Sequence, residues 1–180
     1  MIKKLILFGI LFTNLTYGQD EMNRGYIVEI GQPSPLFSFE ETNGKIFNLS
    51  DHIGKVIMIQ FTASWCSVCI KEMPYIEKDI WQIHNNNENF LLLALAKDDI
   101  RQPQNKEDVH FMRQKTGATY PIEIDKKSEI FQLFASKKAG VTRNIIINKK
   151  GEISYLTRLF DMNEFNKMVD KIDELLKTKD

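Results

Sequence analysis

The chain has 180 residues, of which 43% are hydrophobic and 27% charged, and its formal net charge is zero. This length suits a single domain with one good core, and the composition is typical of a folded globular protein rather than a disordered or membrane-spanning one. The basic residues form no polybasic stripe, so we do not expect a nucleic-acid partner.

The N-terminus has the pattern of a secretory signal peptide. A basic start precedes a short apolar run, residues 5–12, that is too brief to span a bilayer, and small residues follow at Thr16 and Gly18. We expect cleavage before Gln19 and export to the periplasm, while a buried N-terminal strand or an uncleaved anchor is the alternative. The predicted organisation is a signal peptide at 1–18, an N-terminal segment at 19–30 and one domain at 31–180.

The domain opens with alternating strand-like and helical runs, which are typical of a mixed α/β fold. Residues 36–39 and 46–49 predict a hairpin, because the Asn43-Gly44 dipeptide between them tolerates the positive φ of a tight turn. The apolar run 55–62 predicts a buried central strand.

The next segment predicts a helix with Cys66 at its start and Cys69 one turn inside it. We expect Pro74 to kink this helix, because proline lacks the N–H that an internal helix position donates. Its apolar residues at helical spacing are Ile70, Met73, Ile76, Ile80 and Ile83.

The second half continues the same alternation after the polar loop 85–89. Strands are predicted at 90–96 and 120–124, helices at 105–115 and 128–134, and an antiparallel pair at 144–147 and 153–156. In the final helix Asp161 and Glu164 have the spacing of a capping box. Its predicted buried residues are Phe165, Met168, Val169, Ile172 and Leu175 or Leu176.

The Trp65-Cys-Ser-Val-Cys69 motif carries the chemistry that the sequence predicts. A strand delivers it to the first turn of a helix, where unsatisfied N–H groups and the helix dipole favour an anion. We therefore expect Cys66 to be the more acidic thiol and the nucleophile that attacks a disulfide. Cys69 lies three residues later, at the right spacing to close a disulfide with it.

Two alternatives assign the cysteines a structural role. A static disulfide would close too short a loop to stabilise the fold much. A zinc site would need two more ligands, and His52, His84 and His110 lack ligand spacing, so we expect no metal.

The run Phe61-Thr-Ala-Ser-Trp-Cys-Ser-Val-Cys-Ile-Lys-Glu-Met-Pro74 resembles the active-site strand and helix of exported thioredoxin-like proteins of the TlpA/ResA type, within the redoxin superfamily. The resemblance extends from Gly31 to the C-terminus. It implies a thioredoxin-like α/β fold, with a central mixed sheet flanked by helices, an N-terminal β-hairpin extension and an insertion after the strand at 90–96.

The resemblance also implies roles for individual residues. Cys66 becomes the attacking thiol, Cys69 the resolving thiol and Trp65 the aromatic wall beside them. Glu72 matches an acidic residue that lies near the thiols in the ResA-like branch, where a carboxylate could accept the Cys69 proton. Gln60 stands where cytoplasmic thioredoxins carry a buried carboxylate, and an amide cannot act as a base.

One departure from the family lies in the loop at Val141-Thr142-Arg143. The family usually has a cis-proline where this chain has Thr142, and a cis bond before threonine would cost about 2.5–4 kcal/mol. The family loop pairs with substrate beside the thiols, so the change concerns substrate binding and redox potential. Thr142 and Arg143 could instead offer a hydroxyl and a cation to the thiolate.

The sequence therefore predicts a thiol-disulfide oxidoreductase that acts on exported proteins, with no cofactor besides its own disulfide. The family resemblance favours the reducing direction, whereas an oxidase or isomerase would use the same two cysteines and differ chiefly in potential. Such a reductase needs a membrane electron donor, and we expect the protein to be a monomer. The alternatives are a peroxiredoxin-like thiol peroxidase, whose Pro-x-x-x-Thr-x-x-Cys pattern is missing around Cys66, and a redox-inactive binding module.

Overall fold

A computed structural model describes residues 24–178, which form a five-stranded sheet and a separate hairpin. The strand order of the sheet is β5-β4-β3-β6-β7, with β3, β4 and β5 parallel and β6 and β7 antiparallel to their neighbours. The strands are β3 (Val56–Thr62), β4 (Phe90–Lys97), β5 (Ile122–Asp125), β6 (Arg143–Ile147) and β7 (Ile153–Arg158). β3 is the middle strand and all seven of its residues are buried, which agrees with the central strand predicted from the apolar run 55–62.

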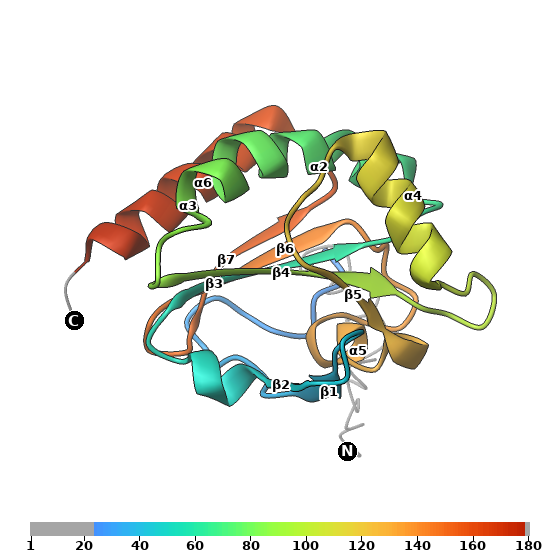
Figure 1. The fold of residues 1–180 in the computed structure, drawn as a ribbon. Coiled ribbons are helices and arrows are strands. Elements are labelled where there is room, and N and C mark those ends of the chain that lie inside the picture. The colour runs from blue at the N-terminus through green and yellow to red at the C-terminus, as the bar shows by residue number, and fades with distance from the viewer. Residues whose placement is uncertain (1–23, 179–180) are drawn as a thin grey trace, which may run out of the picture.

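Helices cover one face of this sheet (Figure 1). Met73 on α2, Met112 on α4 and Phe165 on α6 belong to one buried cluster together with the side chains of that sheet face. The helices are α2 (Ser67–Ile76), its continuation through a π-helical turn (Glu77–Trp81) into α3 (Gln82–His84), α4 (Lys106–Thr116) and α6 (Met162–Lys177).

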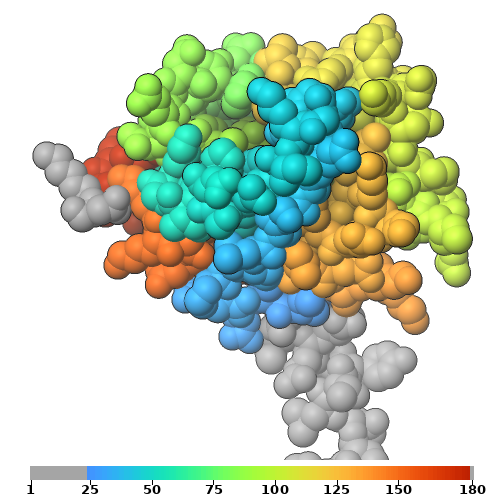
Figure 2. Space-filling view, turned by 60° about the horizontal axis from the view of Figure 1, so that its bottom comes forward, coloured from blue at the N-terminus to red at the C-terminus, as the bar shows by residue number. Residues whose placement is uncertain are grey.

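The other face is covered by a hairpin and a short helix. The hairpin strands are β1 (Ser38–Glu40) and β2 (Ile46–Asn48), followed by a 3-10 turn (Leu49–His52), and the helical pieces are Lys126–Ser128 and α5 (Phe131–Phe134). Figure 2 shows the hairpin segment, in blue and cyan, lying beside the orange segment that contains α5. Phe37 and Phe134 meet edge to face across this contact, with ring centroids 6.2 Å apart.

The fold class and nearly all predicted elements are confirmed, with ends that differ by a few residues. Gly44 at the tip of the hairpin has a φ of +84°, as the turn requires. The antiparallel pair β6 and β7 and the burial of Phe165, Met168 and Ile172 on α6 are as expected, whereas Val169, Leu175 and Leu176 are half-buried.

Two local expectations need correction. The first concerns the apolar stripe of the helix that follows Cys66. A π-helical turn begins three residues after Pro74, and its extra residue rotates the following part of the helix. Ile83 is therefore 65% exposed instead of joining the apolar stripe. The capping box at α6 is only half formed, because Asp161 accepts the Glu164 N–H while the Glu164 carboxylate binds the Arg24 guanidinium.

The predicted signal peptide at 1–18 lies outside the described residues, so it stays a prediction. Within residues 24–178, no helix is both long and apolar enough to cross a membrane. The described chain begins at Arg24, and the residues from there to Ser34 pack against the domain, with Tyr26 and Val28 in its core.

Candidate active site

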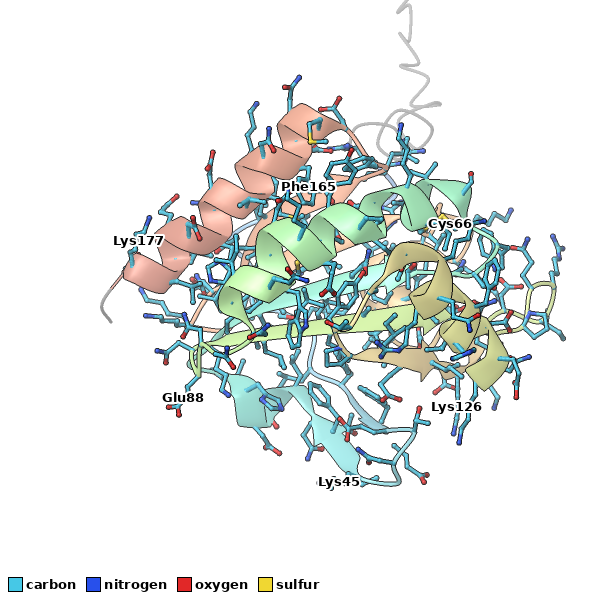
Figure 3. All side chains as sticks on the ribbon, turned by 45° about the horizontal axis from the view of Figure 1, so that its top comes forward. Lys45, Cys66, Glu88, Lys126, Phe165 and Lys177 are labelled. Atoms are coloured by element: carbon cyan, nitrogen blue, oxygen red, sulfur yellow. A yellow bond between two sulfur atoms is a disulfide. The ribbon has the colours of Figure 1, made fainter. Side chains whose placement is uncertain are left out.

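The two cysteines lie at the start of α2, just beyond the end of the central strand β3. Figure 3 shows Cys66 at this N-terminal end of the helix, on the opposite side of the molecule from Lys177 at the end of α6. Cys66 is the N-cap of α2, with extended backbone, and its sulfur accepts the backbone N–H of Cys69 at 3.2 Å. The first turn of α2 contains no acidic residue, so no carboxylate there opposes a negative charge on Cys66.

Cys66 and Cys69 form a disulfide, with their Cα atoms 5.3 Å apart. Cys66 is 8% exposed and Cys69 is fully buried. Trp65, immediately before Cys66 in the chain, is 43% exposed. An incoming sulfur can therefore reach Cys66 but not Cys69.

Thr142 closes the site from the loop that immediately precedes β6. Its hydroxyl oxygen lies 3.2 Å from the sulfur of Cys66 and 3.2 Å from the sulfur of Cys69. Thr142 and Val141 are both buried, and the Val141–Thr142 peptide bond is trans. The Thr142 hydroxyl therefore lies beside both sulfurs, although Thr142 follows the cysteines by more than seventy positions in the chain.

Arg143 has its contacts away from the sulfurs. Its guanidinium donates to the carbonyl oxygens of Gly140 and Arg24, at 2.9 and 2.7 Å, and lies 4.3 Å from the ring centroid of Tyr26. The structure records no hydrogen bond from Arg143 to either cysteine. The suggestion that Arg143 supplies a cation to the thiolate is therefore not supported by these contacts, which tie the N-terminal segment to β6.

Glu72 is buried one turn after Cys69 on the same helix. Its Oε1 accepts a hydrogen bond from Asn144 Nδ2 at 2.7 Å, while its Oε2 has no partner. Burial raises the pKa of Glu72 to about 7, and the hydrogen bond from the side-chain amide of Asn144 only partly opposes this rise. Glu72 can therefore change its protonation state near neutral pH.

Gln60 continues the buried polar cluster on β3. Its Oε1 accepts the hydroxyl of Tyr120 at 3.0 Å, and its Nε2 is unpartnered, as is Oδ1 of Asn144. Gln60 and Asn144 are directly paired across β3 and β6, and Asn144 is the residue that donates to Glu72. Pro74 lies exposed on the outer side of α2, away from this cluster.

Several residues of the site carried no recognisable signal in the sequence. Asn144 and Tyr120 were expected only as parts of strands, yet they hold Glu72 and Gln60. Ser64 is fixed in the loop before Cys66, because its N–H binds Gln104 Oε1 at 2.9 Å and its hydroxyl binds Asp108 at 3.1 Å.

The three histidines lie apart from the cysteines and from one another. His52 stacks on Phe47 with ring centroids 4.8 Å apart, His84 lies 3.1 Å from Asp173, and His110 is on α4. Over the described part of the chain, no three His, Cys, Asp or Glu side chains gather as ligands of a metal ion would.

A buried Cys-x-x-Cys disulfide at the N-terminus of a helix, reached after the central strand of a mixed sheet, defines a protein of the thioredoxin-like class. The sequence model of the Redoxin family matches residues 29–176, so this chain belongs to the Redoxin family. The expected TlpA/ResA type is also supported by similar proteins, which include thiol-disulfide oxidoreductases named ResA.

Two curated relatives come from Bacillus subtilis (strain 168). The thioredoxin-like protein YneN is 30% identical over 125 residues, which are 68% of each chain. The thiol-disulfide oxidoreductase ResA is 28% identical over 104 residues, which are 58% of this chain and 54% of ResA. The match thus spans about half the length of ResA.

Solved structures support the same fold. A protein disulfide isomerase candidate from Bacteroides thetaiotaomicron is 46% identical, with a TM-score of 0.79 over 86% of this chain and 94% of that one. A DsbE thiol:disulfide interchange candidate from Chlorobium tepidum has a TM-score of 0.68 at 20% identity, covering 83% of this chain and 99% of that one, which shows the fold alone.

Proposed function

We propose that this protein is a thiol-disulfide oxidoreductase in which Cys66 attacks and Cys69 resolves. The observation that carries the proposal is the unequal placement of the two sulfurs. Cys66 is at the mouth of the site and accepts the Cys69 N–H at the start of α2, whereas Cys69 is buried behind it. A helix N-terminus lowers a thiol pKa, and the thiolate is the form that attacks disulfides.

The exchange takes place in two steps. The Cys66 thiolate attacks one sulfur of a substrate disulfide, which forms a mixed disulfide and releases the other substrate sulfur as a thiolate. Cys69 then loses its proton and attacks the sulfur of Cys66, which releases the second substrate sulfur. The substrate gains two electrons, and the Cys66–Cys69 pair is left as the disulfide.

Glu72 is the group we assign to the proton of Cys69. It is one turn away on α2, and its pKa of about 7 allows it to be ionised in part of the molecules at neutral pH. Gln60 cannot fill this role because an amide is not a base. The carboxylate takes the proton as Cys69 attacks and returns it when the pair is reduced again.

We further propose that the substrates are exported proteins and that the protein acts as a periplasmic reductase. The signal-peptide pattern of residues 1–18 and the similarity to ResA support this assignment. A reductase outside the cytosol needs a supply of electrons, so a membrane electron donor is the implied partner. Its own disulfide is the redox group, with no further cofactor.

The test is the reduction potential of the Cys66/Cys69 pair, measured by equilibration with glutathione and with dithiothreitol. A potential near or below about −250 mV is expected for a reductase, whereas one near about −120 mV, as in DsbA, would make the protein an oxidant. Cys66→Ser is the control, since it keeps Cys69 but cannot form the disulfide. Failure of the unmodified protein to exchange would leave a redox-inactive binding module.

A further inference from the structure

The hydroxyl of Thr142 is the only side-chain hydroxyl recorded in contact with both sulfurs within residues 24–178. It lies 3.2 Å from each of them, beside the start of α2. A hydroxyl has one hydrogen to donate and two lone pairs that accept. Both disulfide sulfurs can only accept from it, but once the pair is reduced the hydroxyl can donate to one sulfur while it accepts from the thiol of the other.

The backbone around Thr142 holds this hydroxyl in place. The Thr142 carbonyl accepts the Leu159 N–H at 3.1 Å. The next residue, Arg143, is fixed by its bonds to the carbonyls of Gly140 and Arg24. Because Thr142 is only 3% exposed, water has little access to compete for the hydroxyl. The donor is thus oriented before any charge develops on sulfur.

We propose that Thr142 is a catalytic residue whose hydroxyl donates a hydrogen bond to the Cys66 thiolate and accepts one from the Cys69 thiol in the reduced protein. The proposal rests on the exchange function proposed above and deepens it. A negative sulfur is a much better acceptor than a neutral thiol, so the hydroxyl favours the state in which Cys66 alone is charged. Together with the Cys69 N–H, it stabilises the attacking sulfur from two sides.

The same hydroxyl serves the second step. Once Cys66 is bonded to the substrate sulfur, it no longer carries a charge, and Cys69 is the sulfur that must become a thiolate. The hydroxyl then donates to Cys69 as its proton leaves for Glu72. No atom of Thr142 is consumed, and the electrons pass only between sulfurs.

Thr142→Val tests the hydroxyl with almost no change of shape. A hydrogen bond to a charged group is worth at least a factor of about ten in an equilibrium constant, so we expect the pKa of Cys66 to rise by about one unit. The reduced form also loses stability where Cys66 is ionised. The reduction potential there should fall by about 30 mV, which is tenfold for two electrons.

Thr142→Ser is the matched control, because it keeps the hydroxyl and removes only the methyl group. The proposal is supported if the serine variant keeps the pKa and potential of the unmodified protein while the valine variant shifts both. It is overturned if the valine variant has unchanged values, or if serine shifts them as much as valine does, which would point to packing. Far-UV circular dichroism verifies that both variants are folded.

The measurement also separates this proposal from the function on which it rests. The pKa of Cys66 follows from the thiolate absorbance, and it requires no substrate. If the unmodified protein exchanges disulfides and the valine variant behaves identically, only the role of Thr142 is wrong. If the unmodified protein forms no exchangeable disulfide, the proposed function fails and the role of Thr142 fails with it.

Discussion

Among single residues, Glu72 is a carboxyl group of the site whose charge near neutral pH depends on its burial. Its pKa rises from an ordinary 4.5 to about 7 because the folded chain removes water from it. One oxygen of the Glu72 carboxyl accepts a hydrogen bond from Asn144, and the other oxygen has no hydrogen-bond partner. A buried ionised carboxylate with one free oxygen is costly, so below about pH 7 the protonated form is the more stable one inside the protein.

This pKa predicts how stability changes with pH in the oxidised protein. Between pH 4.5 and about 7 the unfolded chain ionises Glu72 while the folded chain keeps it protonated, so the free energy of unfolding falls as pH rises. The contribution of Glu72 to the free energy of unfolding is largest below pH 4.5, and by about pH 7 it has fallen by on the order of 3 kcal/mol. Urea unfolding across this range measures it.

Glu72→Gln is the comparison that isolates this group. Glutamine cannot ionise, and its side-chain oxygen can still accept from Asn144. The free energy of unfolding of the variant, relative to that of the unmodified protein, should therefore increase as pH rises through the same range. Asp125, whose pKa is also raised by burial, to about 6, is present in both proteins and cancels. A constant difference between the two proteins at every pH would show that Glu72 titrates normally.

At the scale of elements, the loop before Cys66 depends on the start of α4. Asn105 caps α4 and forms a capping box with Asp108, in which each side chain accepts the backbone N–H of the other residue. Asp108 uses its second oxygen to accept the hydroxyl of Ser64, two residues before Cys66. One carboxylate thus joins the helix end to the site.

We predict that Asp108→Ala lowers both stability and reactivity. Loss of the capping interaction should cost about 1 kcal/mol of unfolding free energy, and the freed Ser64 loop should slow the reaction of reduced Cys66 with a small disulfide reagent several-fold. Asp161→Ala removes the cap of α6, and Asp161 has no recorded hydrogen bond to Ser64, so this variant should lose a similar amount of unfolding free energy without slowing the reaction. Equal rates in the two variants would contradict the link through Ser64.

For the whole molecule, Tyr26 links the N-terminal segment to the sheet. Its hydroxyl donates to the carbonyl oxygens of Thr157 and Asn144, at 2.5 and 3.3 Å, and its ring lies against the Arg143 guanidinium. Arg24 adds a bond to Glu164 on α6. The segment that begins at Arg24 is therefore expected to unfold together with the domain rather than before it.

Two substitutions of Tyr26 measure this link. Tyr26→Phe removes the hydroxyl but keeps the ring, and should lower the free energy of unfolding by about 1 kcal/mol. Tyr26→Leu also removes the ring contact with Arg143, and should lower it by at least about 1 kcal/mol more. Urea unfolding followed by tryptophan fluorescence and by circular dichroism should give one shared transition. An early transition seen by one probe alone would mean that the segment unfolds separately.

The kind of fold and the position of the cysteine pair follow from local patterns in the sequence. Apolar runs and helical spacing are local patterns, so β3, α2, the β6–β7 pair and the start of α2 at Cys66 could be predicted from neighbouring residues. The Cys-x-x-Cys spacing likewise determines within four residues that the two sulfurs can bond.

The side chains that contact the two sulfurs and the Glu72 carboxyl come from distant parts of the chain, so they are known only from the folded structure. Thr142 reaches Cys66 across 76 positions of the chain, and Asn144 reaches Glu72 across 72. Glu164 likewise binds Arg24 where its spacing to Asp161 indicated a full capping box. Such contacts depend on how strands and helices pack after they form, and residue spacing along one segment carries no information about the direction of a side chain on another.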